Sequence, residues 1–365
     1  MFSTAEKEQY HRQLLLKEIG EEGQSGLKKS RVLVIGAGGL GSAILPYLTA
    51  AGIGHIGIID HDTVDLSNLH RQVLFEVKDV GQNKAAIAAE KLSALNPHIR
   101  ITPYPTALTK ENALELFSSH DIIVDGSDNF PTRYLVNDAA VICGKPVVFG
   151  SIFKFEGQVS VFNYEDGPTY RCLFPDPPLP GTSPNCSEIG VLGVLPGIVG
   201  TMQANEVIKI ICGIGEVLSG KLFTIDCLTM QTQVLRFRKN VFEVPEGLNN
   251  VEYACINESG IVSEVTIGDV IKKMPENLVL VDVRTKEERE VSNISTLFPG
   301  YADLHIPLNE LAQRHPNIPG NKHIIFYCQS GVRSLQAAQW YSGEYPSEVV
   351  SSLYGGLNVL SNSIN

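Results

Sequence analysis

Apolar and polar positions follow two alternating patterns along the first third of the chain. Short apolar runs predict strands, and apolar residues that recur every three to four positions predict helices. The predicted strands are 31–35, 55–60, 99–104 and 121–125, the predicted helices are 41–51, 83–95 and 110–117, and an amphipathic segment, 8–19, precedes them. Strands that alternate with helices predict βαβ units, in which a largely parallel sheet carries helices on both faces.

The pattern changes twice farther along the chain. Residues 147–164 and 221–238 are β-rich without helices, which predicts a mixed sheet that continues the first half. The polar, loop-like segment 241–260 then marks a boundary. Beyond it the predicted elements are a helix at 266–273, strands at 278–283 and 323–327, and a helix that starts within 330–343. We therefore predict an α/β domain of residues 1–245, a linker of 246–258 and a small α/β domain of 259–365.

Composition and charge narrow the classes of protein. A chain of 365 residues suits two domains, and 43% hydrophobic with 19% charged residues is typical of a soluble globular protein. The net charge of −11 argues against a nucleic-acid-binding surface. The start has no signal-peptide pattern, and the most apolar run, 189–202, is too short and too broken by Gly and Pro to span a membrane. Seven scattered cysteines fit reduced thiols and a cytoplasmic location.

A glycine-rich loop follows the first predicted strand. Gly36, Gly38 and Gly41 form G-x-G-x-x-G at the mouth of a helix. Such glycines let the backbone approach a phosphate, and the helix N-terminus supplies N–H donors. Asp60 ends the second strand, where an acidic residue can bind ribose hydroxyls. These features alone fit NAD about as well as ATP.

Two cations after the second strand favour ATP. Arg71 in "DHDTVDLSNLHRQ" and Lys84 in "GQNKAAIAAEKL" could neutralise charge at an α-phosphorus and on a leaving pyrophosphate, which a dehydrogenase does not need. The spacing is equally compatible with solvated side chains. Asp128 in "DIIVDGSDNFPTRY" follows a strand's carboxyl end, where it could hold Mg²⁺ or cap the helix that starts at Asn129.

A second candidate site lies near the end of the chain, in "CQSGVRS" at 328–334. Cys328 follows a strand and precedes a helix, so its sulfur would face backbone N–H groups and the positive end of that helix. These donors stabilise a thiolate or a persulfide, and Arg333 adds a positive charge. We discount a buried strand-end cysteine, because Ser330, Gly331 and Arg333 predict a polar and open turn.

Residues 9–238 resemble the ubiquitin-activating-enzyme-like adenylyltransferases of molybdopterin and thiamine biosynthesis. The resemblance rests on the motifs above, in the family's order, together with "YRCLFPD" and "GVLGVLPGIVGTMQANEVIK". It implies a Rossmann-like adenylation domain, ATP with Mg²⁺, and a homodimer. Its implied site residues are Gly39, Asp60, Ser67, Asn68 and Arg71 on the nucleotide, Lys84 on phosphates, Asp128 on Mg²⁺ with Asn129 beside it, and Arg12 of "YHRQLLL" from the partner subunit.

The cysteines depart from this family's pattern. Its members commonly bind a structural zinc with two C-x-x-C pairs, but Thr169 stands in for the first cysteine here and "LRFRKN" lacks the second pair. Tetrahedral zinc needs four ligands, so we predict no zinc and a packed thiol at Cys172. In fused relatives, the cysteine at the place of Cys186 is implicated in sulfur transfer. An unreactive loop cysteine fits its Pro/Gly-rich surroundings equally well.

Residues 259–365 resemble a rhodanese sulfurtransferase domain. "LVLVDVR", "HIPL" and "LYGGLNVL" match its motifs, although the segment around His305 lacks the usual glycine before His and the Gly-Ala after Pro. Related cysteine phosphatases have one more residue between Cys and Arg, so the spacing from Cys328 to Arg333 suits a persulfide sulfur better than a phosphate.

Together the two resemblances predict a two-step enzyme. The first domain would adenylate the C-terminal glycine of a ubiquitin-like sulfur-carrier protein that ends in Gly-Gly. Sulfur from a Cys328 persulfide, loaded by a donor such as a cysteine desulfurase, would then give a thiocarboxylate, directly or through Cys186. A non-catalytic carrier-binding scaffold and a nicotinamide-dependent oxidoreductase remain alternatives. The carrier and its pathway, whether molybdopterin, thiamine or tRNA thiolation, stay open.

Overall fold

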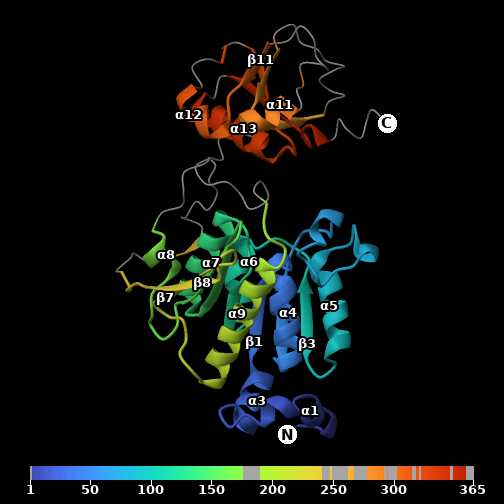
Figure 1. Cartoon of the computed structure of the whole chain (residues 1–365), viewed down its shortest axis with the longest axis vertical. Coiled ribbons are helices and arrows are strands. Elements are labelled where there is room, and N and C mark those ends of the chain that lie inside the picture. Colours follow the sequence, from blue (N-terminus) through green and yellow to red (C-terminus); the bar gives the residue numbers. More distant parts are fainter. Residues whose placement is uncertain are drawn as a thin grey trace. The chain divides into compact units, whose positions relative to one another are not determined.

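The computed structural model describes most of the chain. The described residues are 2–175, 190–240, 247–248, 262–266, 278–291, 294, 302–314, 318–319, 322–345 and 348–358. They fall into two compact units, one that ends at residue 248 and one that begins at residue 262 (Figure 1). The predicted linker lies outside the described residues except for 247–248, and the helix predicted at 266–273 lies outside them except for its first residue.

The first unit contains one mixed sheet, as the β-rich segments predict. Its strands are β1 (Arg31–Ile35), β2 (His55–Ile59), β3 (Arg100–Tyr104), β4 (Ile122–Asp125), β5 (Val147–Phe153), β6 (Glu156–Phe162), β7 (Lys221–Asp226) and β8 (Gln231–Arg236). Their order is β3-β2-β1-β4-β5-β6-β7-β8. The pairings from β3 to β5 are parallel, and those from β5 to β8 are antiparallel. The chain order therefore reverses direction at β1, between β2 and β4.

Helices cover both faces of this sheet. They are α4 (Gly39–Ala51), α5 (Lys84–Leu95), α6 (Lys110–Ser118), α7 (Phe130–Cys143), α8 (Tyr170–Leu173) and α9 (Leu195–Cys212). Val32 and Val34 of β1 pack with α4, α5 and α9, whereas Leu33 and Ile35 pack with α6 and α7. Successive side chains of a strand point to opposite faces, so a strand buried on both sides is apolar throughout. This explains why β1 was predictable from its unbroken apolar run.

The predicted amphipathic segment, 8–19, contains the end of one short helix and the whole of a second, and a third helix follows it. These are α1 (Thr4–Gln9), α2 (His11–Leu14) and α3 (Gly20–Lys29). Gln24 of α3 donates to the Ala51 carbonyl at the end of α4, and a Cβ on Gly52 would lie 2.6 Å from the Tyr10 ring. The helices α1 and α3 thus lie beyond the C-terminal end of α4, at the end of the first unit that carries the N label in Figure 1.

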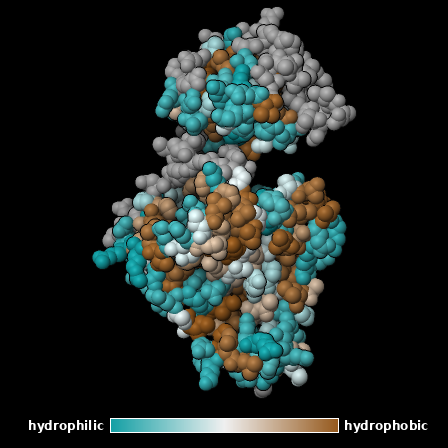
Figure 2. All heavy atoms as spheres, viewed as in Figure 1, coloured by the Kyte–Doolittle hydropathy of each residue, from teal (hydrophilic) through white to brown (hydrophobic). Residues whose placement is uncertain are grey.

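The surface of the first unit exposes several apolar side chains. Figure 2 shows brown, apolar residues over the N-terminal part of α9, and Val194, immediately before that helix, is 59% exposed. Leu15 and Leu16, which follow α2, are 60% and 50% exposed. Within the described ranges, no helix combines the length and the hydropathy that crossing a bilayer requires.

The second unit is a smaller α/β unit with a parallel sheet. Its strands are β9 (Ser263–Val265), β10 (Leu278–Asp282), β11 (Ala302–His305), β12 (His323–Tyr327) and β13 (Val349–Leu353), in the order β11-β10-β12-β13-β9. Its helices are α11 (Lys286–Val291), α12 (Leu311–Arg314) and α13 (Val332–Glu344). The central strands β10 and β12 were predicted, whereas the strands β9, β11 and β13 were not. Those three are short or polar, and tertiary pairing determines them more than their own pattern.

Candidate functional site

A cavity of about 430 Å³ lies at the carboxyl ends of β1, β2 and β4. Ligands of open α/β sheets bind at this edge, where the strand order reverses. The residues named from the sequence that line it are Gly36, Gly38, Gly39, Asp60, Asn68, Arg71, Lys84, Asp128 and Asn129. Four separate segments of the chain therefore meet at one site.

The glycines of the loop have different roles. Gly36 has a φ of +88°, which favours glycine, and it lines the cavity. A Cβ on Gly41 would lie 2.2 Å from the Gly36 carbonyl oxygen, so this glycine lets α4 pack against the loop. Gly41 is not among the residues of the cavity wall. Gly41 therefore acts indirectly, because its missing side chain allows the conformation of the loop that a ligand would contact.

Asp60 holds the loop to the end of β2. Its Oδ2 accepts the Ala37 N–H at 2.8 Å, and its Oδ1 accepts the Asp62 N–H at 2.8 Å. Burial raises the pKa of Asp60, while the two backbone N–H groups and Lys84 oppose that shift. The carboxylate keeps further lone pairs toward the cavity that it lines, in keeping with the predicted contact to a ribose.

Lys84 is buried at the start of α5. It is 5% exposed, it lines the cavity, and its Nζ lies 3.1 Å from Asp62 Oδ2. Asn83 caps the helix by accepting the Ala86 N–H, and it donates to the Asp60 carbonyl. The solvated-lysine alternative is therefore wrong, because the capped helix holds the ammonium group at the cavity wall.

Arg71 lies on the same side of the cavity. Its Nη1 donates to the Ser67 carbonyl at 3.2 Å, which places the guanidinium against the short 3₁₀ turn Leu66–Asn68. Ser67 itself is exposed and does not line the cavity, whereas Asn68 does. Arg71 and Lys84 thus both approach from segments that follow β2.

Asp128 is an exposed carboxylate at the cavity wall. Asn129 caps α7, because its Oδ1 accepts the Thr132 N–H at 2.9 Å. The capping alternative for Asp128 is therefore wrong. A carboxylate oxygen of Asp60, a ring nitrogen of His61 and a carboxylate oxygen of Asp62 also lie within 4.8 Å of one another. The exposed carboxylates of Asp62 and Asp128 at the wall of this cavity fit Mg²⁺, which binds one or two carboxylates plus phosphate oxygens.

Arg12 does not reach the cavity of its own chain. It is exposed on α2, in the helical group beyond the C-terminal end of α4, while the cavity lies by the N-terminus of α4. A contribution of Arg12 to an active site requires another subunit. This placement agrees with the trans role implied by the resemblance without testing it.

The sequence reasoning missed three buried polar residues in the cavity wall. They are Gln72, Ser127 and Arg133, which are 3%, 8% and 8% exposed. Within the described part of the chain, Gln72 Oε1, Ser127 Oγ and Arg133 Nε have no hydrogen-bond partner. The sequence shows Arg133 as a cation one helical turn after Asn129. Only the fold shows that its side chain points into the cavity wall.

Cys172 is a packed free thiol, as predicted. Its Sγ accepts the backbone N–H groups of Thr169 and Asn240, both at 3.3 Å. Of the described residues, only Asp60, His61 and Asp62 form a group of three possible metal ligands, and Cys172 is not among them. The donor set around Cys172 therefore does not fit a tetrahedral zinc site.

Cys328 lies between β12 and α13 in the second unit. Gly331, with a φ of +91°, donates its N–H to Cys328 Sγ at 3.2 Å, and the thiol donates to Ser334 Oγ at 3.6 Å. The cysteine is fully buried. The prediction of an open turn is therefore wrong, although the predicted backbone donor to sulfur is present.

The "LYGGLNVL" segment explains this burial. Leu357 donates its N–H to the Cys328 carbonyl at 2.9 Å, and a Cβ on Gly356 would lie 2.4 Å from that oxygen. A Cβ on Gly331 would lie 2.8 Å from the Gly355 nitrogen. The two glycines thus let the segment pack directly against the cysteine loop, which a sequence pattern alone does not indicate.

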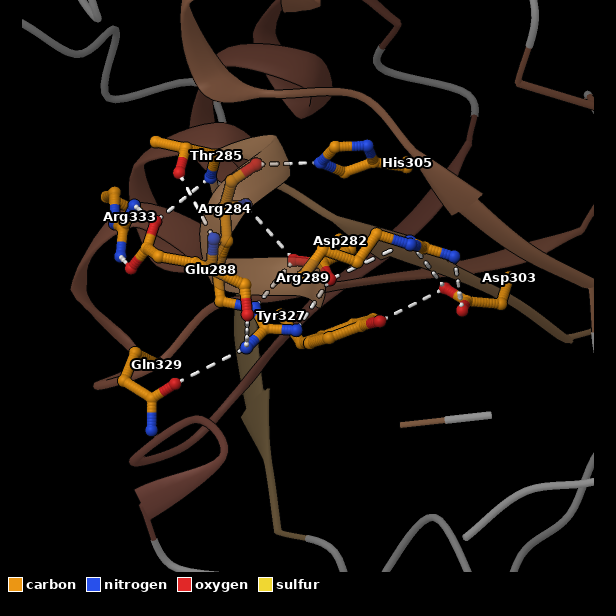
Figure 3. Close-up of polar contacts among 10 residues, drawn as sticks. All are labelled: Asp282, Arg284, Thr285, Glu288, Arg289, Asp303, His305, Tyr327, Gln329 and Arg333. Atoms are coloured by element: carbon orange, nitrogen blue, oxygen red, sulfur yellow. Dashed lines mark hydrogen bonds and ion pairs between the residues drawn. The ribbon is translucent and has the colours of Figure 1, made fainter. Parts of the chain in front are cut away.

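Arg333 is paired with Glu288 of α11 (Figure 3). Its Nη1 and Nη2 donate to Glu288 Oε2 and Oε1 at 2.8 and 2.7 Å, in a bidentate arrangement. The guanidinium lowers the pKa of Glu288 to about 2. The positive charge that Arg333 was predicted to add to the loop is therefore compensated by a carboxylate 45 residues earlier.

A second ion pair supports the same loop. Arg284 of "LVLVDVR" is fully buried and donates to Asp282 through Nε and Nη2, at 3.0 and 2.8 Å. Its Nη1 lies 3.4 Å from Gln329 Oε1, the residue after Cys328. The His305 ring bonds to the Arg284 carbonyl at 2.9 Å, as Figure 3 shows. The irregular segment around His305 is thus joined to the cysteine loop through Arg284.

Cys186, the second cysteine that the sequence analysis considered for sulfur transfer, lies outside the described residues.

Comparisons with known proteins agree with this arrangement. A model of the ThiF family matches residues 10–243, and a model of the rhodanese-like domain matches residues 266–363. A sulfur carrier protein adenylyltransferase of Thermus thermophilus is 53% identical over 66% of this chain and 90% of its own length. The probable adenylyltransferase/sulfurtransferase MoeZ of Mycobacterium tuberculosis is 42% identical over 92% of this chain and 88% of its own. A crystal structure of Escherichia coli MccB, 24% identical, has a TM-score of 0.59 over 67% of this chain and 75% of that chain, a likeness of fold alone.

Proposed function

The chain belongs to the ThiF family and continues into a rhodanese-like domain, and from this we propose that it adenylates and then thiolates a sulfur carrier. The substrate would be the C-terminal glycine of a ubiquitin-like protein that ends in Gly-Gly. One observation carries the proposal. A cavity lined by a glycine loop, Arg71, Lys84 and Asp128 occurs in the same chain as a cysteine whose sulfur accepts a backbone N–H.

In the first step, a carboxylate oxygen of the carrier attacks the α-phosphorus of ATP. The bond from that phosphorus to the bridging oxygen breaks, so pyrophosphate leaves and an acyl-adenylate forms. The loop at Gly36–Gly39 and the N-terminus of α4 would hold the phosphates. Lys84 and Arg71 would neutralise charge on the leaving pyrophosphate, and Asp128 would hold Mg²⁺, which supplies further positive charge. The contribution of the protein is positioning and charge neutralisation.

In the second step, the outer sulfur of a Cys328 persulfide attacks the acyl carbon. AMP leaves, and the carrier becomes joined to Cys328 through an acyl disulfide. We propose that the thiolate of Cys186 then attacks Cys328 Sγ, which releases the carrier thiocarboxylate and leaves a Cys186–Cys328 disulfide. A thiol reductant would restore both cysteines. A cysteine desulfurase is the proposed source of the next persulfide sulfur.

The functional assembly would be a homodimer in the reducing cytoplasm. Arg12 can serve an active site only from another subunit, and the exposed Leu15 and Leu16 beside it supply apolar surface for such a contact. The cytoplasm is proposed because the chemistry needs free thiols, and all five cysteines of the described part are free.

Mass spectrometry of the carrier tests the complete scheme. The full chain is incubated with ATP, Mg²⁺, a persulfide source and a ubiquitin-fold carrier that ends in Gly-Gly. We expect the carrier to gain the mass difference of one sulfur in place of one oxygen, and Cys328→Ala to abolish this gain. If the gain persists in Cys328→Ala, the second unit has no part in the sulfur transfer.

The adenylation step is tested separately by carrier-dependent ATP–pyrophosphate exchange. Removing a preorganised cation or metal ligand at a reacting phosphate costs about 100-fold or more in rate. We expect losses of this size in Lys84→Ala and Asp128→Ala. Unchanged exchange in both variants would favour the carrier-binding scaffold, and a chain without any exchange would revive the nicotinamide alternative.

A further inference from the structure

The cavity contains a third cation, Arg133 of α7, that the proposed chemistry does not yet use. Its side chain is 92% buried, since 8% is exposed, and it lines the cavity. The guanidinium carbon lies 5.5 and 5.4 Å from the ring centres of Phe130 and Phe149. Its Nη2 donates to the Ser127 carbonyl over a long 3.4 Å, and the guanidinium also bonds to the Tyr170 side chain. The guanidinium therefore lies near two aromatic rings, and the hydrogen-bond partners named here, Ser127 and Tyr170, are neutral.

No described carboxylate forms an ion pair with Arg133 within 4.0 Å, and its Nε has no hydrogen-bond partner within the same ranges. The fully buried Asp125 attracts the guanidinium electrostatically, but its Oδ1 already accepts the Ser127 N–H at 2.9 Å. Burial raises the pKa of Asp125, which makes it a weaker counter-ion. A buried charge without a full set of partners is unfavourable, so the Arg133 guanidinium would be stabilised by an anionic group of a ligand in the cavity.

The sheet order separates Arg133 from the other cations of the cavity. Arg71 and Lys84 come from segments after β2, whereas Arg133 follows β4 and contacts Phe149 of β5. The strand β1, with its glycine loop, lies between β2 and β4. The glycine loop, Arg71 and Lys84 would hold a triphosphate on the β2 side of the cavity. Arg133, on the β4 side, would then be available to bind a second anion.

We propose that Arg133 binds the C-terminal carboxylate of the carrier protein and positions it for attack on ATP. This rests on the proposed function, whose reaction brings together two anions, a triphosphate and a carboxylate. A guanidinium matches a carboxylate through two parallel N–H donors. The two aromatic rings exclude water and strengthen that interaction. The carboxylate becomes a neutral acyl group on adenylation, so Arg133 holds the substrate more tightly than the product.

A change in the ligand's charge tests this assignment directly. Two forms of a ubiquitin-fold carrier that ends in Gly-Gly are prepared by peptide ligation, one with a terminal carboxylate and one with a terminal carboxamide. Their binding to the full chain is measured with a non-hydrolysable ATP analogue present. Because a hydrogen bond to a charged group contributes about 1.5–3 kcal/mol, we expect the wild type to prefer the carboxylate by at least about 10-fold. Arg133→Gln is expected to bind both forms equally.

Arg71→Gln is the matched control, because it removes a guanidinium from the other side of the same cavity. It should weaken binding of the ATP analogue and keep the carboxylate preference. In exchange assays, Arg133→Gln should raise the KM for the carrier at least tenfold and change the KM for ATP less than threefold. Arg133→Lys, which keeps the charge, should restore part of the preference if the Gln variant folds poorly.

The outcomes separate this inference from the proposed function. If Arg133→Gln and Arg133→Lys keep the full wild-type preference while the wild type catalyses exchange, Arg133 does not bind the carboxylate and the adenylation proposal stands. If Arg133→Gln loses ATP affinity and keeps the preference, the anion at Arg133 is a phosphate and our inference is overturned. If the wild type catalyses no carrier-dependent exchange, the proposed function fails first.

Discussion

At the scale of single residues, the pair of Arg333 and Glu288 decides how the cysteine loop is held. The bidentate contact joins α13 to α11 and keeps Glu288 ionised, with a pKa of about 2. Replacing Glu288 by Gln removes the charge that fixes Arg333 beside Cys328. We expect Glu288→Gln to lower the thiosulfate:cyanide sulfurtransferase rate of the full chain about tenfold, since such hydrogen bonds contribute about 1.5–3 kcal/mol.

The neighbouring Glu287 provides the control, because it lies on the same helix and has no ion pair with the described residues. Glu287→Gln should leave the sulfurtransferase rate within twofold of the wild type. ATP–pyrophosphate exchange should be unaffected in both variants. A Glu288→Gln variant with the wild-type sulfurtransferase rate would show that the ion pair does not position the loop.

At the scale of elements, the contact between α4 and the glycine loop affects both the stability of the first unit and its proposed nucleotide binding. A Cβ on Gly41 would lie 2.2 Å from a backbone oxygen, which neither side can relieve by a rotamer change. Gly38 differs, because its Cβ would meet its nearest neighbour, Gln72 Nε2, at 3.7 Å. Overpacking costs about 1–3 kcal/mol, so we expect Gly41→Ala to lower the unfolding midpoint of the first unit by about 2–10 °C.

Gly38→Ala is the matched variant for this measurement. It should keep the wild-type unfolding midpoint within about 1 °C, because the new methyl group fits, and should weaken ATP binding by narrowing the cavity. Calorimetry of the full chain with and without ATP separates these effects. Equal midpoints for Gly41→Ala and the wild type would show that the backbone of α4 adapts without cost.

Elements were predictable wherever their own side chains determined them. The apolar run of β1 gave its bounds of Arg31–Ile35, and the helical pattern of 83–95 gave α5 to within one residue. Contacts between distant segments were not predictable. The packing around Cys328 depends on Gly331 and Gly356, and the inward-facing side chain of Arg133 lies near Phe149, a residue of the later strand β5. Spacing along the chain contains no information about such tertiary neighbours.

At the scale of the whole molecule, each unit has its own hydrophobic core and its own histidine whose pKa is lowered by burial. Clusters on the two sheet faces form the core of the first unit, and separate clusters form that of the second. In the first unit, His120 is fully buried; in the second, His323 is half-buried against Ser351. Burial lowers the pKa of both rings, so each unit favours a neutral histidine independently.

The surroundings of His120 explain why its neutral form is favoured. Its Nδ1 lies 2.7 Å from the Leu116 carbonyl, so this nitrogen carries the proton as a donor. Its Nε2 is buried without a hydrogen-bond partner among the described residues, and its ring stacks on His55 at 5.3 Å. Burial lowers the pKa of both histidines, and Arg31 adds to the effect on each. A proton added at Nε2 would create a buried charge without an acceptor.

Linkage gives the sign of the resulting pH dependence. Below the ordinary histidine pKa of about 6.5, the unfolded chain binds protons that the folded chain does not bind. The free energy of unfolding therefore decreases as the pH is lowered. Carboxylates such as Glu6, with a pKa of about 2, contribute only at lower pH, below about 4.5. We expect the free energy of unfolding of the first unit to decrease between pH 7.5 and pH 5.5, measured by calorimetry on the unfolding transition that ATP binding shifts. His120→Gln should flatten this dependence and the exposed His61→Gln should keep it, whereas a wild-type slope in His120→Gln would exclude the buried imidazole as its cause.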